Sequence, residues 1–397
     1  GYIDTIHAEE RNLPSEDCWW RVGLKLGEAQ AATLTGQVLK PLLNSLPGTE
    51  AHSRDWIDYA LRYSKLISKL FQNTPQAPIQ QFWTDLWPQI DQRFTQWLEP
   101  FYGGLHNLPA SPPVMQHHIP KQLNRYRMQG RRVALIVLDG MSLAGWLAAY
   151  EKLNKQLPSN LKVETGGVFS WLPSLTPVCR QATYSGQAPR LFQETITRTD
   201  RDGPRWKAFW EANAELRPNQ IHHSHHKGNP GEAELDPDML DSTVALGLTV
   251  EKPDKIMHGS SLGWAGWYQQ IGLWLDNGYL GKLMTRLIES GYTVCVTSDH
   301  GNLEATGTGK ISQGVLAESR GQRCRLYAKE SLCASTHSDY PDTTNHLDLL
   351  ISGEKMHPLF AKGRGAFVAE GETIVTHGGA SLDEMIVPWV VIEGGAK

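Results

Sequence analysis

The residues best suited to chemistry stand where apolar runs of the sequence end. The clearest run, at 293–297, is rich in β-branched residues and is followed after one serine by Asp299, His300 and Gly301. The pattern predicts a buried strand with a carboxylate and an imidazole at its carboxyl end. Ligands bind at that end of the strands in open α/β sheets, so the pair is a candidate metal site. The alternative is a turn that only ends the strand.

A second run, at 133–138, is apolar throughout and leads through Asp139 into a helical pattern at 143–153. A fully apolar strand followed by a helix is typical of a parallel sheet covered on both faces. Asp139 is therefore expected at the same edge of the sheet as Asp299. Taken alone, an aspartate in that position could simply cap the following helix.

A third segment places a hydroxyl at the start of a predicted helix. Pro177 fits the first helical turn and Thr176 the N-cap, and Ser185 with Gly186 is expected to end the helix. Backbone N–H groups at such an end can hold a phosphoryl oxygen beside the threonine. Arg180, four residues on, lies on the same helical face and could reach the same anion. The alternative is an ordinary capped helix.

Three further residues complete a set of ligand types. Asp254 and His258 follow a predicted strand at 244–250 with a four-residue spacing, which one helical turn would bring onto one face, although either could be a plain surface residue. Three carboxylates and three imidazoles suit two divalent cations, zinc or manganese, with the Thr176 oxygen completing one site. The candidate ligands are Asp139, Asp254, His258, Asp299, His300 and His377.

The remaining pattern predicts two domains. Apolar stripes at helical spacing in 55–72 and 82–97 indicate a helical region, although Pro88 should end or kink the second helix early. A proline-rich linker places the boundary between residues 1–127 and an α/β domain at 128–397. The polar segment 187–243 is expected to be a cap-like insertion, with a histidine tract at 222–226 that either binds metal or faces substrate. His117 and His118 are expected at the surface.

Composition narrows the setting. The 397 residues carry a net charge of −4, which gives no general attraction to nucleic acid or to an anionic membrane. Five cysteines without metal-finger spacing favour a reducing cytoplasm. No apolar run approaches the length of a bilayer span, and no signal sequence is present. A first residue that is glycine indicates a processed protein or a piece of a longer one.

Four motifs, in this order and spacing, resemble the alkaline phosphatase superfamily, and their wording matches its PglZ branch, found in BREX bacteriophage-defence systems. The resemblance covers roughly residues 130–395. The motifs are Leu138-Asp139-Gly140-Met141, Pro173-Ser174-Leu175-Thr176-Pro177, Thr297-Ser298-Asp299-His300-Gly301 and Thr376-His377-Gly378-Gly379, with the later Ile386-Val387-Pro388.

The resemblance implies an alkaline-phosphatase-like, mostly parallel sheet with helices on both faces, preceded by a smaller helical domain. It implies that Thr176 is a nucleophile that forms a phosphothreonine, which water at the other cation then hydrolyses. Arg180 is assigned to the phosphate from helical spacing alone, and Ser142 and Ser174 are runner-up hydroxyls. By analogy, one metal would lie among Asp139, Thr176, Asp299 and His300, and the other among Asp254, His258 and His377.

The expected activity is that of a two-metal phosphohydrolase. Its expected substrate is a phosphate ester, such as a phosphodiester, a nucleotide or DNA, and its expected partners are other BREX defence proteins. The fold does not decide among monoesters, diesters and other substrates. One alternative is a non-catalytic scaffold that binds partner proteins, against which the complete ligand set argues. A phosphomutase is another alternative.

Overall fold

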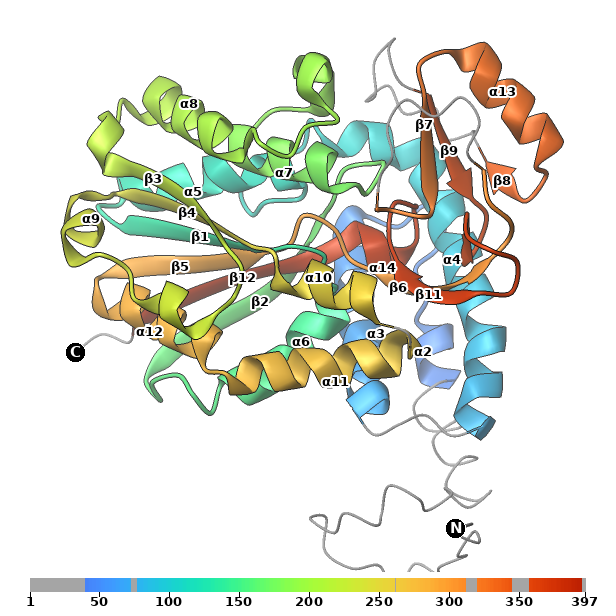
Figure 1. The fold of residues 1–397 in the computed structure, drawn as a ribbon, viewed down its shortest axis with the longest axis horizontal. Coiled ribbons are helices and arrows are strands. Elements are labelled where there is room, and N and C mark those ends of the chain that lie inside the picture. The colour runs from blue at the N-terminus through green and yellow to red at the C-terminus, as the bar shows by residue number, and fades with distance from the viewer. Residues whose placement is uncertain (1–39, 73–76, 261, 312–319, 345–356, 395–397) are drawn as a thin grey trace, which may run out of the picture.

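The computed structural model describes residues 40–72, 77–260, 262–311, 320–344 and 357–394, and a six-stranded sheet forms its centre (Figure 1). β1 pairs in parallel with β4 and β5, β3 is parallel to β4, and β12 runs antiparallel to both of its neighbours. The expected mostly parallel sheet is therefore confirmed. The strand order is β2 (Leu161–Phe169), β12 (Ile386–Gly394), β5 (Tyr292–Thr297), β1 (Arg132–Leu138), β4 (Ala245–Val250) and β3 (Ile221–His226).

The central strands are apolar because helices cover both faces of the sheet. Every residue of β4 and β5 is buried, and alternate residues of β1 pack into opposite cores. Figure 1 shows α5 (Ile119–Met128), α7 (Thr176–Ser185) and α8 (Asp202–Ala214) on one face, with α6 (Leu143–Leu153), α11 (Gly263–Asp276) and α12 (Tyr279–Glu289) on the other. Gly278, whose φ is +77°, separates α11 from α12.

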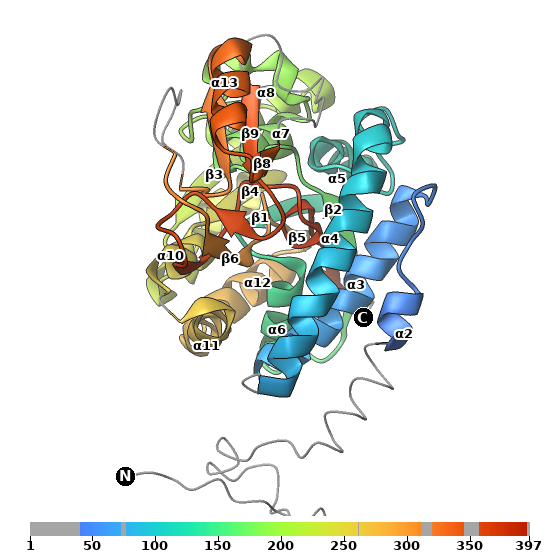
Figure 2. The ribbon, with the colours of Figure 1, turned by 90° about the vertical axis from the view of Figure 1, so that its right-hand side faces the viewer.

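The N-terminal helices pack directly on the sheet domain. α3 (Ser53–Gln72) and α4 (Ala77–Leu105) lie side by side after the short α2 (Lys40–Asn44) (Figure 2). Trp56 of α3 contacts Phe94 of α4 with ring centroids 4.9 Å apart, and Phe94 stacks on Phe169 of β2. Of the two predicted effects of Pro88, an end of the helix is wrong, because α4 continues through it, and a kink stays a prediction. Burial of Leu86 and Ile90 on one face offsets the hydrogen bond that the proline removes. The division at residue 127 stays a prediction.

The polar segment 187–243 contributes to the main domain. It holds α8, the edge strand β3 and α9 (Pro237–Ser242), and β3 pairs with β4 along its whole length. The sequence of β3, which is rich in histidine, gave no strand signal. An edge strand pairs with one neighbour and exposes part of its surface, so it does not need an apolar sequence. Within the described part of the chain, no helix is both long and apolar enough to cross a membrane. Four cysteines are buried as free thiols, and Cys18 lies outside the described residues.

Two small sheets stand beside the carboxyl end of the main sheet. One has the order β10 (Gly365–Ala366), β6 (Leu303–Gly307), β11 (Thr373–Thr376), and the other has the order β7 (Cys324–Tyr327), β9 (His357–Ala361), β8 (Thr343–Thr344). α13 (Glu330–Asp339) packs on β7 and β9. His377 directly follows β11. It therefore reaches the carboxyl end of the main sheet from the first small sheet.

A buried ion pair joins these sheets to the start of β12. Arg323 Nε lies 2.9 Å from Glu384 Oε1, and both side chains are almost fully buried. Glu384, in the short helix α14 (Leu382–Met385), also accepts hydrogen bonds from the backbone N–H groups of Gly379 and Ser381. Ser381 and Glu384 form a capping box at the start of this helix. This network fixes the loop that follows His377.

We expect Arg323→Met to lower the free energy of unfolding by about 3–5 kcal/mol, because it leaves a buried carboxylate without its cation. The matched control is Lys152→Met, which breaks an exposed pair with Asp276 at 2.7 Å and should cost less than about 1 kcal/mol. Urea unfolding followed by tryptophan fluorescence measures both. Equal losses for the two variants would show that the pair does not anchor the sheets.

Candidate metal centre

The three predicted carboxylates meet at the carboxyl ends of β1, β4 and β5. Asp139 follows β1 directly, Asp299 comes two residues after β5, and Asp254 lies in the first turn of α10 (Lys252–Gly259), which follows β4. The backbone N–H of Gly140 donates to Asp299 Oδ1 at 3.0 Å. Parallel register of the three strands is what brings these positions, distant in sequence, to one edge.

The imidazole of His300 follows Asp299 at the end of β5, whereas that of His377 follows β11 in a small sheet. The rings of His300 and His377 stack with centroids 3.6 Å apart. His300 Nδ1 lies 3.0 Å from the carbonyl oxygen of Gly301, and His377 Nδ1 lies 2.8 Å from that of Ser174. A carbonyl oxygen only accepts, so each Nδ1 carries the proton and each Nε2 keeps its lone pair. Both rings are therefore oriented as metal ligands.

At this edge of the sheet, two groups of the described side chains have the spacing of a metal site. In the first, Asp254, His258 and His377 each offer a ligand atom within 4.8 Å of the others, the set that the resemblance implies for one metal. In the second, Asp139, Asp254 and His300 do the same. Asp299 Oδ2 lies 3.6 Å from His300 Nε2, at the edge of the second group. Asp254 thus stands between the two groups.

Unpartnered atoms show that the residues fit bound cations. Four buried atoms of the cluster form no hydrogen bond with the described residues, and Asp254 Oδ1 forms none although His258 Nε2 is 3.1 Å away. A buried polar atom without a partner is costly, so several together call for a ligand. The donor set of carboxylate oxygens and imidazole nitrogens suits zinc or manganese. The four atoms are Asp139 Oδ1, Asp254 Oδ1, Asp299 Oδ2 and His377 Nε2.

Electrostatics leads to the same conclusion. Burial, with the charge of Asp299, raises the pKa of Asp139 well above its ordinary value. Burial also raises the pKa of Asp299 to about 6. Burial and the neighbouring His300 hold the pKa of His377 well below its ordinary range, so that ring stays neutral. A divalent cation among these groups would favour ionised carboxylates and neutral imidazoles, the forms that bind metal.

Thr176 faces the centre from the start of α7. It is the first helical residue and Leu175 is the N-cap, so the predicted N-cap position was one residue too late. Its Oγ1 lies 3.0 Å from His300 Nε2. As predicted, the helix ends at Ser185 before Gly186. Gly186 has a left-handed φ of +66°. The half-buried hydroxyl thus stands beside both a candidate ligand and the N-terminal backbone of a helix.

The runner-up hydroxyls have structural contacts. Ser142 Oγ accepts from the N–H of Gly145 and caps α6. Ser174 Oγ donates to the carbonyl of Gly379 at 2.8 Å and accepts from the N–H of Gly378 at 3.1 Å. Both serines are buried, and Ser174 holds the loop that carries His377.

Arg180 points where the four-residue spacing predicts, but its nitrogens face protein oxygens. Nη1 donates to Asp139 Oδ2 at 2.8 Å, Nη2 donates to the carbonyl of Thr199 at 3.3 Å, and Nε lies 2.9 Å from Asp202 Oδ2. The side chain is buried. Burial opposes its charge, yet the two aspartates hold its pKa above the ordinary value. These contacts support positioning of Asp139, and direct contact with a phosphate stays a prediction.

Several residues that position the site were missed in the sequence. Gln116 Nε2 donates to the carbonyls of Ser298 and Asp299, while its Oε1 accepts from the N–H of Trp171. No local pattern marks this glutamine. Gly301 is explained by close approach, because a Cβ there would lie 1.8 Å from the carbonyl oxygen of Asp383.

The surface position expected for His117 and His118 is wrong, because both are buried. His118 Nδ1 accepts from the N–H of Met115 at 3.2 Å. Burial lowers the pKa of His118 to about 4. The two rings thus lie in the core beside Trp171, where the linker folds back against the sheet.

The chain is similar to several solved structures at low identity. Murine ectonucleotide pyrophosphatase/phosphodiesterase 5 is 13% identical, with a TM-score of 0.46 and coverage of 67% of this chain and 89% of that chain. Phosphonoacetate hydrolase from Sinorhizobium meliloti 1021, in complex with phosphonoformate, is 12% identical, with a TM-score of 0.40 and coverage of 66% and 89%. No curated protein matches the chain.

A family model gives the assignment. The model described as the BREX system PglZ alkaline phosphatase-like domain matches residues 114–392, which begins upstream of the predicted boundary at 128 and includes every candidate ligand. The match spans well over half of the chain, and it confirms the resemblance expected from the four motifs. The chain therefore belongs to the PglZ family of alkaline phosphatase-like domains.

Proposed function

We propose that this chain is a two-metal phosphoester hydrolase that uses Thr176 as its nucleophile. The observation that carries the proposal is the position of the Thr176 hydroxyl, 3.0 Å from His300 Nε2, beside buried carboxylates and imidazoles with unpartnered ligand atoms. A positioned hydroxyl next to a potential metal ligand is the arrangement that nucleophilic phosphoryl transfer requires. The family's description as alkaline phosphatase-like supports the same class of reaction.

Each side chain has a task in this proposal. The bound cations would supply positive charge beside the attacking and phosphoryl oxygens. His300 would hold one cation through its Nε2 lone pair, 3.0 Å from the Thr176 hydroxyl. The backbone N–H of Thr176, the first residue of the ten-residue helix α7, would face a phosphoryl oxygen, because Pro177 has no N–H and those of Val178 and Cys179 donate to the Leu175 carbonyl. The Thr176 oxygen forms a bond to phosphorus while the bond from phosphorus to the leaving alcohol breaks, and the threonine proton passes to that alcohol. Water later breaks the bond between phosphorus and the threonine oxygen, which releases the phosphate product and restores the threonine hydroxyl.

Two arginines hold charge around this reaction. Arg180 opposes the rise in the pKa of Asp139 and orients its carboxyl group through the 2.8 Å contact, and so acts as a positioning residue. Arg320 is 70% exposed and its Nη1 lies 3.5 Å from Asp254 Oδ2. In our proposal, Arg320 is the guanidinium that an incoming substrate meets, a residue that the sequence pattern did not single out.

The proposed substrate is a phosphodiester, either a nucleotide ester or the end of a DNA strand, in a bacterial defence system with other BREX proteins as partners and in the cytoplasm. A monoester brings an additional negative charge, and the guanidinium nearest to Thr176 along α7 already pairs with two aspartates. A scaffold without activity is the competing proposal. A scaffold would have no need for buried ligand atoms without hydrogen-bond partners, whereas a metal-dependent hydrolase would.

We expect Thr176→Ala to lower kcat by at least about a thousandfold, because it removes the attacking oxygen. Thr176→Ser is the matched control and should retain part of the activity, since it keeps a hydroxyl at the same backbone position. Turnover of a nitrophenyl phosphodiester with added zinc or manganese measures both. Circular dichroism and metal content should stay close to those of the wild type. Unchanged turnover in the alanine variant would remove Thr176 from the nucleophile's role.

The substrate class is tested with bis(nitrophenyl) phosphate and nitrophenyl phosphate under the same metal conditions. We expect a higher kcat/KM for the diester. Hydrolysis of DNA should fall steeply as salt rises, because binding of a polyanion to this acidic chain must use local basic patches, whereas the small diester should hardly respond. A monoester preference above about tenfold, about 1.4 kcal/mol, would contradict the proposed pocket.

A further inference from the structure

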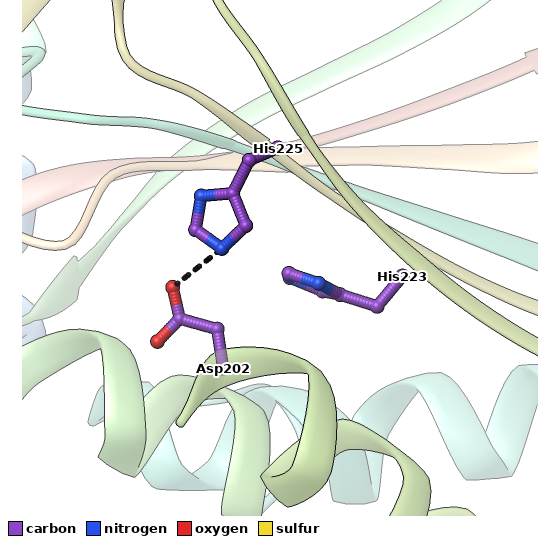
Figure 3. A group of neighbouring side chains, drawn as sticks. All are labelled: Asp202, His223 and His225. Carbon is purple, nitrogen blue, oxygen red and sulfur yellow. Dashed lines mark ion pairs between the residues drawn. The ribbon is translucent and has the colours of Figure 1, made fainter. Parts of the chain in front are cut away.

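A second cluster of ligand-type side chains lies on the far side of Arg180 from the centre described above. We propose that Asp202, His223 and His225 bind a further divalent transition-metal ion, such as zinc (Figure 3). Asp202 begins α8, and the two histidines belong to β3, which packs against that helix. Figure 3 shows the carboxylate and both rings converging from these two elements.

The geometry suits a tetrahedral ion. His223 and His225 are two residues apart on a strand, so both project from the same face. Asp202 Oδ2 lies 3.5 Å from His225 Nε2, and the three residues offer ligand atoms within 4.8 Å of one another. Tetrahedral ligands with bonds of about 2.1 Å stand about 3.4 Å apart. The carboxylate and His225 already have that separation, and a small ring rotation would bring in His223.

Asp202 lacks partners in a way that calls for a cation. It is fully buried, and neither oxygen accepts a hydrogen bond from the described residues, although Arg180 Nε lies 2.9 Å from Oδ2. That guanidinium also serves Asp139, so two buried carboxylates share one positive charge. Burial of a carboxylate without hydrogen bonds is costly, and a bound ion would remove that cost.

The surroundings of the rings resemble the outer contacts of metal-binding histidines. His223 Nε2 lies 3.4 Å from Thr249 Oγ1, which can accept a hydrogen bond from the ring N–H and leave Nδ1 as the ligand atom. A Cβ at Gly203 would lie 3.4 Å from that Nδ1, so the glycine keeps the approach from α8 open. On His225, Glu251 Oε1 lies 3.8 Å from Nδ1, opposite the nitrogen that faces Asp202.

The rest of the histidine tract is excluded by its own contacts. His226 is buried, with Nδ1 2.8 Å from the Tyr279 hydroxyl and Nε2 3.0 Å from Ser224 Oγ. His222 falls on the same strand face as His226, away from Asp202. His223 and His225 therefore face a buried carboxylate, whereas His222 and His226 do not. A cluster of histidines that binds metal only by chance would not need this division.

Protonation and access both permit binding. Burial lowers the pKa of His223 to about 3 and holds that of His225 below its ordinary value, so both rings are neutral at neutral pH. Burial raises the pKa of Asp202 to about 7, so an ion would compete with a proton for this carboxylate. The side chain of His225 is 37% exposed and leaves the cluster open to ions from solvent.

The test counts metal ions in the full chain, purified without a histidine tag. The wild type and a His223→Gln/His225→Gln double variant are stripped with a chelator, equilibrated with zinc, passed through a desalting column and analysed for zinc by mass spectrometry. His222→Gln is the matched control from the other face of β3. We expect the double variant to hold one ion fewer than the wild type and the control to lose none.

Asp202→Asn gives an independent variant that keeps the shape of the side chain and should also lose one ion. Cobalt(II) in place of zinc should show an absorption band in the wild type that weakens in both variants. Thermal unfolding of the metal-free proteins should be similar, which separates loss of the site from loss of the fold. Equal metal content in all variants, or the same loss in His222→Gln, would overturn the proposal. Because the readout is a difference in ion number, it does not depend on whether the chain hydrolyses phosphoesters.

Discussion

The structure depends on the meeting of three carboxylates at one buried edge of the sheet. Asp139, Asp254 and Asp299 are buried where β1, β4 and β5 end, and each has an oxygen without a hydrogen-bond partner among the described residues. Negative charge without water or partners is unfavourable in a protein interior. Arg180 contacts Asp139, and the exposed Arg320 lies 3.5 Å from Asp254. In our proposal, bound cations supply the remaining positive charge. Hydrogen bonds of the surrounding loops, such as those from Gly140 to Asp299 and from Asn302 to the carbonyl of Gly140, hold this edge in place.

Different parts of the chain deliver the other ligands. The main sheet supplies the carboxylates and His300, whereas His377 arrives from a small sheet that is tied to the core by the Arg323–Glu384 pair. Ser174 orients His377 through its carbonyl and supports the loop after it through its hydroxyl. Thr176 comes two residues later, at the start of α7. One short segment therefore links the orientation of a candidate ligand to the position of the proposed nucleophile.

The features that could be predicted from the sequence are those set by local residue patterns, such as the central strands and the residues at their carboxyl ends. Apolar runs at β1, β4 and β5 located the carboxyl ends of these strands. Contacts between distant segments were not predictable: Arg180 is committed to two aspartates, and Gln116 bonds to carbonyls more than 180 residues away. β3 was missed because an edge strand needs no fully apolar sequence. Its two faces became distinguishable only once α8 placed Asp202 against one of them.

The measurement that tests the central claim most directly is anomalous diffraction at the zinc edge from crystals of the metal-loaded chain. Our account predicts two strong peaks at the carboxyl ends of β1, β4 and β5, one next to Asp254, His258 and His377 and the other next to Asp139, Asp299 and His300. Two-metal phosphoesterase sites hold their ions about 4 Å apart, and a similar separation is expected here. The absence of anomalous density among these residues, in crystals that contain zinc elsewhere, would contradict the account.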